Sequence, residues 1–200
     1  QVNFQGQVLQ SSANSKDIFI LKLSPDGDVL WARSEGGSMA ENAYGIATDS
    51  QNNVILTGQF SGNSVIGGQN FQSIINPTEN LPSYDLFISK YDSDGNPIWV
   101  VTGQAIYEDR GMDVAVDNLN NIYVCGQFSD TLTFAGQQFN NNGYNTGFLA
   151  KLNPAGQIQW MNTLRAGLVL PYSLAINSGN EVIITGDFRG NLIHTTPGGQ

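Results

Sequence analysis

A strand–turn–strand pattern that is written three times constrains the fold of this chain more than any other feature. Each copy has a first strand with Phe and Lys, a turn that contains Gly, and a second strand with Trp. The copies occupy residues 17–31, 85–99 and 147–160. Polar, Gly-containing turns between runs of β-branched and aromatic residues are typical of β-hairpins. The sequence therefore predicts a hairpin at each copy.

A second pair of strand-like runs recurs between these hairpins, at residues 44–60, 112–128 and 172–188. A short polar turn joins the two runs of each pair, and no stretch shows a helical period. Four strands thus recur every 60 to 68 residues or so. This pattern predicts an all-β fold made of β-propeller blades, each a four-stranded antiparallel sheet. A β-solenoid is the structural alternative, but solenoid coils are usually shorter than these repeats.

The repeat predicts one propeller segment that spans the whole chain. Its expected parts are a partial blade at 1–34, complete blades at 44–102 and 112–164, and a partial blade at 172–200. The chain begins with Gln rather than Met, and residues 2–7 align with residues 132–137, the tail of a repeat. Because propellers usually have four to eight blades, these repeats are expected to belong to a larger ring in a longer protein.

Charge and cysteine content narrow the classes of partner. The formal net charge of −9 and the pI near 4.2 disfavour a phosphate backbone or an anionic membrane surface as a partner. No apolar run approaches the length of a membrane span, and no signal peptide opens the chain. Cys125, the one cysteine, lies in an apolar strand pattern and is expected to be a buried thiol. We therefore expect no nucleic acid partner and no membrane insertion.

The repeated residues resemble a known family. The pattern Asp-x-Phe-x-x-Lys-Leu at residues 17–23 is followed by Gly-Ile-Ala-x-Asp at 45–49 and Thr57-Gly58, and the second copy repeats it at 113–117 and 121–126. These motifs are similar to the bacterial β-propeller repeat called SBBP. The resemblance implies a module of large secreted or cell-surface bacterial proteins, including adhesins and type IX secretion cargo of Bacteroidetes. It implies no shared set of catalytic residues.

One turn has the composition of a metal site. Asp92, Asp94 and Asn96 alternate around Gly95, as oxygen ligands do at the start of a calcium loop. The downstream glutamate of an EF-hand loop is missing, and the equivalent turns at 24–28 and 153–157 lose acids while they keep the glycine. Hairpin turn chemistry explains the motif better. Calcium remains a possible ligand here, and no other cofactor is indicated.

Other candidate residues have weaker support as catalytic or ligand-binding groups. Asp49 and Asp117 follow the first strand of each blade, where they can face a central channel or cap an Asx-type turn, and the turn is favoured. The only histidine, His194, and the lone Cys125 offer no nucleophile–base pair. A tryptophan at one fixed strand position per blade is expected to pack between neighbouring sheets.

The loops therefore carry the expected function. We expect contacts from the connections between blades, at 34–42 and 104–111, and from the loops of variable length, at 61–84 and 129–145. Glu41, Glu108 and Asp109 are expected to be solvated. The candidate interaction residues are Glu35, Glu41, Asn42, Tyr107, Glu108, Asp109 and Arg110.

The sequence thus favours a non-enzymatic module of a large secreted or cell-surface bacterial protein that acts in adhesion or in protein or glycan interaction. One alternative is type IX secretion cargo in which the propeller is a passive folded domain recognised by the secretion machinery. Another is a calcium-dependent propeller hydrolase or lyase with its metal near Asp49 and Asp117.

Overall fold

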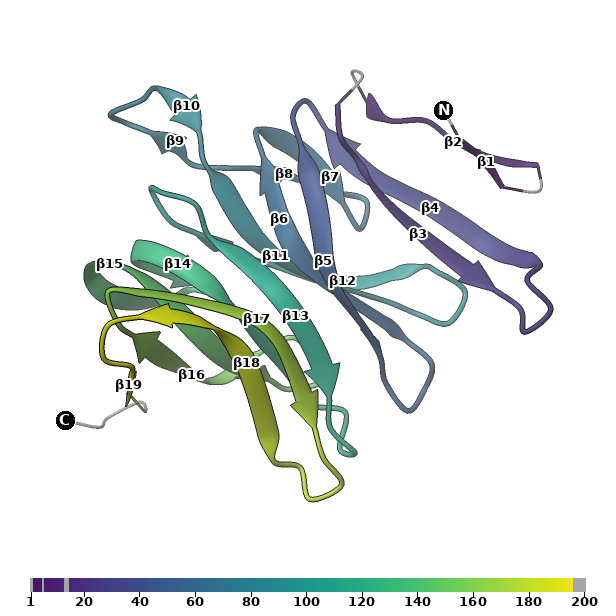
Figure 1. Ribbon diagram of the computed structural model, residues 1–200. Helices are drawn as coiled ribbons and strands as arrows, with labels where there is room; N and C mark the ends of the chain where they lie inside the picture. Colours follow the sequence, from purple (N-terminus) through teal and green to yellow (C-terminus); the bar gives the residue numbers. More distant parts are fainter. Residues whose placement is uncertain (1, 5, 13–14, 196–200) are drawn as a thin grey trace.

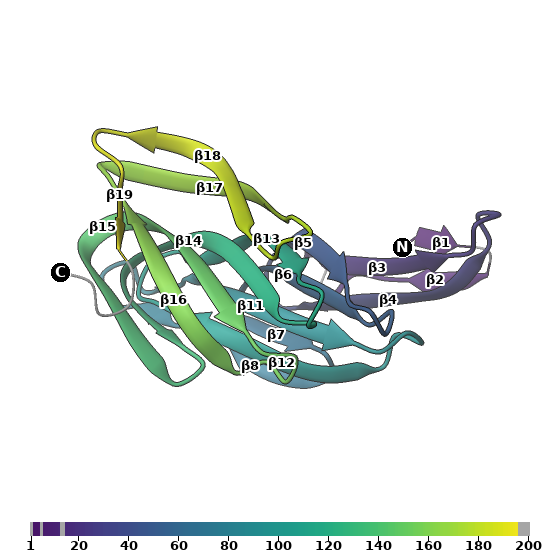
Figure 2. The same cartoon turned by 90° about the horizontal axis from the view of Figure 1, so that it is seen from below.

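The computed structural model describes residues 2–4, 6–12 and 15–195, and this part of the chain contains β-strands and no α-helix. The expected partial blades at 1–34 and 172–200 include residues 1, 5, 13–14 and 196–200, which lie outside the described residues. The strands form a curved series of antiparallel sheets, with β3–β4 at one end and β17–β18 at the other (Figures 1 and 2). The chain is an all-β protein built of propeller blades.

Two blades have all four strands. The first complete blade consists of β5 (Glu41–Thr48), β6 (Val54–Ser61), β11 (Tyr84–Tyr91) and β12 (Pro97–Gln104). The second complete blade consists of β13 (Arg110–Val116), β14 (Ile122–Phe134), β15 (Gln137–Leu152) and β16 (Ile158–Arg165). Within each blade every strand pairs antiparallel with the next, so that the strand order equals the chain order.

A half blade lies at each end of the series. The N-terminal half blade is the outer hairpin β3 (Ile18–Leu23) and β4 (Val29–Gly37), and the C-terminal half blade is the inner hairpin β17 (Leu168–Ile176) and β18 (Val182–Arg189). The remaining strands are β1 (Val2–Phe4), β2 (Gln7–Leu9), β7 (Asn63–Ile66), β8 (Gln69–Gln72), β9 (Ile75–Asn76), β10 (Leu81–Pro82) and β19 (Ile193–Thr195).

The hairpin turns explain where each strand ends. In the outer turns the glycine has positive φ, at 89° for Gly27, 83° for Gly95 and 81° for Gly156. In the inner turns an asparagine takes the same left-handed conformation, with φ of 62° at Asn52, 63° at Asn120 and 61° at Asn180. Glycine and asparagine are the residues that tolerate this region, so the repeated Gly and Asn positions fix the register of every hairpin.

The core follows the period-two pattern of the strands. Apolar side chains of β6, β11, β14 and β15 fill the space between neighbouring blades, where the main cluster includes Ile55, Leu86, Val124 and Phe148. Cys125 is buried, as expected, and burial raises the pKa of its thiol to about 12. The second and third strands are the most deeply buried ones, because each has a partner strand on both sides and a neighbouring blade against both faces.

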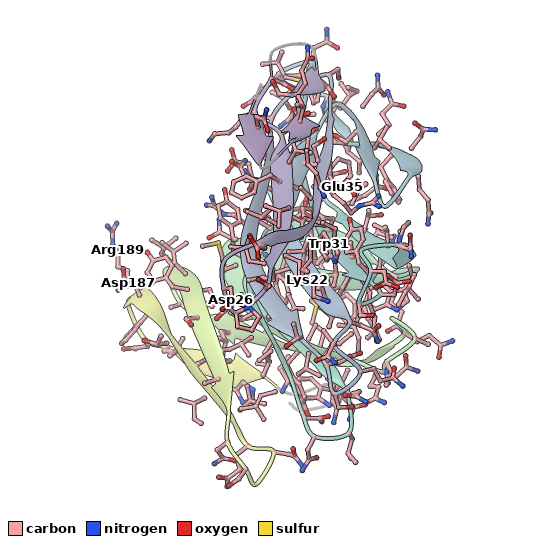
Figure 3. The ribbon with its side chains drawn as sticks, turned by 90° about the vertical axis from the view of Figure 1, so that its right-hand side faces the viewer. Lys22, Asp26, Trp31, Glu35, Asp187 and Arg189 are labelled. Atoms are coloured by element: carbon pink, nitrogen blue, oxygen red, sulfur yellow. The ribbon has the colours of Figure 1, made fainter. Side chains whose placement is uncertain are left out.

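The tryptophans join one blade to the next, as the sequence predicts. Trp31 Nε1 donates a hydrogen bond to the backbone oxygen of Ser93 at 3.0 Å, and Trp99 Nε1 donates one to that of Pro154 at 3.2 Å. Lys22 Nζ also donates to the Ser93 oxygen, at 2.6 Å. Figure 3 shows Lys22 and Trp31 near each other on the β3–β4 hairpin. The outer turns at residues 92–96 and 153–157 therefore rest on the Trp–Lys pair of the preceding blade, a contact that we call the turn joint.

The loops of variable length are more ordered than the sequence predicts. Residues 61–84 form the hairpin β7–β8 and the two-stranded arm β9–β10, and β14 and β15 continue through residues 129–145 as one long hairpin. β7 pairs with β4, and the tip of β14 pairs with β12. These extensions link each blade to the preceding one, because backbone groups that leave the blade find partners on its neighbour's outer strand.

Candidate functional site

A cleft of about 770 Å³ opens on the rim where the connections between blades lie. One wall is the β9–β10 arm with the start of β11, and the opposite wall is the connection between β12 and β13. Figure 1 shows both segments at the same end of the sheets. β14 and β17 contribute Gln127, Ser129 and Leu170, so residues of three successive repeats meet in one cavity. Its volume is in the range of ligand-binding clefts.

The cleft combines exposed apolar and aromatic side chains with charged ones. Leu81 from the arm and Ile106 and Tyr107 from the connection are all exposed, although they are large and hydrophobic. Glu79 and Glu108 bring a carboxylate to each wall, and both residues are exposed. An aromatic and aliphatic surface with acidic groups at its rim suits a partner with apolar and basic side chains.

Arg110 is the basic residue of the cleft, and a neighbour holds its guanidinium. With the Gln127 amide turned so that Oε1 faces the guanidinium, Arg110 Nη2 and Nε donate to that oxygen at 2.8 and 3.2 Å. Gln127 is nearly buried, so it fixes the direction of the Arg110 side chain. Arg110 therefore lines the cleft with a fixed side chain and adds one positive charge beside the two carboxylates of Glu79 and Glu108.

Two buried aspartates hold the walls of the cleft. Asp109 accepts hydrogen bonds from the backbone N–H groups of Ala105 and Leu86, which ties the connection to β11. Asp85 accepts them from Ile74 N and Ser83 Oγ, which ties down the base of the arm. Burial raises the pKa of Asp109 well above its usual range, with a further contribution from the Asp85 charge, and burial raises the pKa of Asp85 to about 6.

Three of the expected interaction residues are structural instead. Glu41 and Asp109 are buried at the start of β5 and beside the start of β13, contrary to the expectation that they are solvated. Glu35 is also buried, in β4, where it accepts a hydrogen bond from Gly67 N at 2.8 Å. The physical reason is that the strands run further than expected and leave connections of only residues 38–40 and 105–109.

The structure brings together Tyr107, Glu108 and Arg110 from the predicted set, and all three line the cleft. Asn42 lies elsewhere, in β5, and accepts a hydrogen bond from Lys16 Nζ. The sequence interpretation did not single out Glu79, Leu81 and Tyr84 as individual residues. The sequence feature that could have pointed to these residues is the 61–84 loop, which is longer than the equivalent loop at 129–145 and contains Pro77 and Pro82.

In the turn with the calcium-like composition, both carboxylate oxygens of Asp92 accept hydrogen bonds from within the turn. Asp92 Oδ1 accepts hydrogen bonds from the N–H groups of Asp94 and Asn96 at 2.9 and 2.8 Å, and Oδ2 accepts one from Asn96 Nδ2 at 2.9 Å. Asn153 makes the same pattern with Ala155 and Gln157 without any acid. The hydrogen bonds from Asn96, above all, lower the pKa of Asp92. These contacts are those of an Asx-capped turn.

Asp49 and Asp117 also cap turns. Asp49 Oδ1 accepts hydrogen bonds from Gln51 N and Asn53 N, and its Oδ2 forms a buried ion pair with Lys90 Nζ at 2.8 Å. Burial alone would raise the pKa of Asp49, but Lys90 and Asn53 outweigh it and the pKa is lowered. Asp117 repeats the arrangement with Lys151 at 3.8 Å. The Asx-turn interpretation is confirmed for both residues.

Nothing in the described part of the chain groups three His, Cys, Asp or Glu side chains so that they could hold a metal ion. His194 lies in β19, which pairs with β16 through Leu164, and it does not line the cleft. A search of residues 2–4, 6–12 and 15–195 for a helix long and apolar enough to cross a membrane finds none.

Comparison with known proteins supports the repeat fold. No protein-family model matches the chain. A segment of 111 residues, 56% of this chain, is 32% identical to an uncharacterized WD repeat-containing protein, L264, of Acanthamoeba polyphaga mimivirus. The match covers 8% of that protein's length. Together with the blades described above, the similarity identifies the chain as a β-propeller-like repeat protein.

Proposed function

We propose that this chain is a non-enzymatic propeller module that binds a basic polypeptide segment in the rim cleft. The observation that carries the proposal is the meeting of exposed Leu81, Ile106 and Tyr107 with the rim carboxylates of Glu79 and Glu108 in one cavity. The net charge of −9 adds a long-range field that attracts a basic partner. Aromatic and aliphatic side chains would supply most of the affinity, and the carboxylates would select the charge.

The likeness of the repeats to the SBBP family supports a place for this module in a large secreted or cell-surface bacterial protein. In that setting the bound segment would belong to an adhesion partner. The alternative, a passive domain of type IX secretion cargo, requires no ligand in the cleft. The binding experiment below therefore separates the two proposals.

The test uses fluorescence anisotropy with two short labelled peptides. One peptide contains Lys, Arg, Val and Thr, and the second has Glu in place of each basic residue. We expect the basic peptide to bind more tightly, with a difference that shrinks as salt is added. Tyr107→Ala and Glu108→Lys should each weaken its binding by about tenfold.

The matched control is Asp94→Lys, which makes the same kind of charge change as Glu108→Lys on an exposed outer turn away from the cleft. This variant should bind as the unmodified chain does. Equal binding of the two peptides, or equal losses in Asp94→Lys and Glu108→Lys, would contradict the proposal and leave general attraction to an acidic surface as the explanation.

A further inference from the structure

A single hydroxyl group lies between the two walls of the rim cleft. Ser83 lines the cleft at the base of the β9–β10 arm, and its side chain is buried. Its Oγ lies 2.6 Å from Asp85 Oδ1, 3.1 Å from the backbone oxygen of Ile74 and 3.3 Å from that of Ala105. Ala105 begins the connection that forms the opposite wall. Because a hydroxyl has one hydrogen, Ser83 donates to one of these oxygens at a time.

The protonation state of Asp85 decides which oxygen receives that hydrogen. An ionised Asp85 only accepts, so Ser83 donates to it and the bond stays within one wall. A neutral Asp85 donates its own proton from Oδ1 to Ser83 Oγ, which frees the hydroxyl hydrogen. The backbone oxygen of Ile74 already accepts Ser83 N at 2.7 Å, which favours Ala105 O across the cleft as the new acceptor. Asp85 Oδ2 keeps its bonds from Ile74 N and Gln104 Nε2 in both states.

The surroundings of Asp85 oppose its charge. In the described part of the chain no cation pairs with this carboxyl. Phe60 lies opposite it on β6, and the Gln104 amide faces it from β12. Asp109, in the connection, is close enough that a charge on Asp85 disfavours its ionisation, and both oxygens of Asp109 accept backbone N–H groups. The other charged residues that line the cleft are Glu79, Glu108 and Arg110, the last of which is held by Gln127.

A junction between two blades does not require these acids. Thr146 and Val169 occupy the repeat positions of Asp85 and Asp109 at the next junction, and neither residue is an acid. β14 and β15 continue there as one long hairpin in place of an arm. Uncharged side chains thus suffice at this place in the fold, so the two buried carboxyls beneath the cleft point to a role beyond holding blades together.

We propose that protonation of Asp85 joins the two walls of the rim cleft, so that the cleft binds its basic partner more tightly in mildly acidic than in neutral surroundings. This regulation rests on the function proposed above. In acid, the bond from Ser83 to Ala105 O ties the arm to the connection. In neutral surroundings that bond is absent, and the charge on Asp85 acts against Asp109. Walls that are already joined lose less freedom when a peptide binds, which raises the affinity.

The first measurement is the affinity for the basic peptide at about pH 5.5 and about pH 7.5, a range in which Lys and Arg keep their charge. Burial raises the pKa of Asp85 to about 6. Its neutral fraction therefore falls from about three quarters to about one thirtieth between these values. If the joined state alone binds, the dissociation constant rises about 25-fold. We expect a rise of about five- to 25-fold, and equal affinities at the two pH values would overturn the proposal.

Two substitutions fix the cleft in opposite states. Asp85→Asn places an amide donor where the neutral acid has its proton, so this variant should bind at both pH values as the unmodified chain does in acid. Ser83→Ala removes the bridging hydroxyl and should bind at both as the unmodified chain does at neutral pH. Glu41→Gln is the matched control: Glu41 is a buried carboxyl at the repeat position of Asp109 in the preceding junction, and it does not line the cleft. This control should keep the pH dependence, and its loss there, or its persistence in Asp85→Asn, would contradict the proposal.

The second measurement needs no peptide, so it separates this proposal from the proposed function. Hydrogen–deuterium exchange of the Ala105 and Asp109 amides, corrected for the effect of pH on the intrinsic exchange rate, should be slower in acid than at neutral pH. Asp85→Asn should make it equally slow at both. A peptide that binds at neither pH would refute the proposed function while this readout still tests the switch. Corrected exchange that is the same at both pH values in the unmodified chain would overturn the switch even if the peptide binds.

Discussion

The turn joint predicts different effects from one substitution at equivalent glycines. Gly27, Gly95 and Gly156 share positive φ values of 89°, 83° and 81°, so alanine carries a similar backbone strain of about 1 kcal/mol at each. At Gly95 the new Cβ would lie 3.0 Å from Trp31 Cδ2, and at Gly156 the same distance from Trp99 Cδ2. Gly27 has no atom within 4 Å of that position.

The contact with the indole adds a second cost at Gly95 and Gly156. The ring must move by a few tenths of an ångström, which weakens the hydrogen bond from its N–H, worth about 1 kcal/mol, and strains the packing by a similar amount. We expect Gly95→Ala and Gly156→Ala to lower the free energy of unfolding by about 2–3 kcal/mol. Gly27→Ala should lower it by about 1 kcal/mol.

Urea denaturation followed by tryptophan fluorescence measures these losses. Equal losses at Gly27 and Gly95 would refute the turn joint as a stabilising contact between blades.

Two further perturbations test the buried charges. Burial raises the pKa of Glu41 to about 7 from 4.5, so the folded state binds a proton that the unfolded state releases, and stability should fall by about 3 kcal/mol as the pH rises from 4.5 to 7. Glu41→Gln should remove that fall in urea titrations, and an unchanged pH dependence would contradict it. Asp49→Ala leaves Lys90 buried without its ion-pair partner and should cost about 3–5 kcal/mol. Lys90→Met in the same chain should recover part of this loss in calorimetry, and no recovery would argue against the pair.

The period of the repeat was enough to predict the blades. Turn residues at fixed positions, together with the apolar runs between them, identify every inner and outer hairpin, because each of these signals lies within a few residues of its hairpin. The packing of each tryptophan between blades also followed from its constant position. The tryptophan's partner, a backbone oxygen of the next blade, could not be predicted, since a carbonyl group carries no side-chain signal.

The candidate site was predictable only in part. Tyr107, Glu108 and Arg110 were recognised because they lie in a connection between blades. Their neighbours Glu79 and Leu81 come to the cleft through the β9–β10 arm, and the hydrogen bonds of Asp85 that hold this arm join residues separated in sequence. Glu41 and Asp109 were expected to be solvated because the segments around them contain Gly, Ser and charged residues. Long-range burial, which sequence composition does not encode, decides their role.

Hydrogen–deuterium exchange tests the central claim that two complete blades lie between two half blades. Backbone amides of β6, β11, β14 and β15 have partners on both sides of their strands, so they should exchange most slowly. Amides of β18 that face away from β17 have no partner strand in the described part of the chain, so they should exchange fast. Slow exchange of both edges of β18 in the single chain, or fast exchange of β6, would contradict the account.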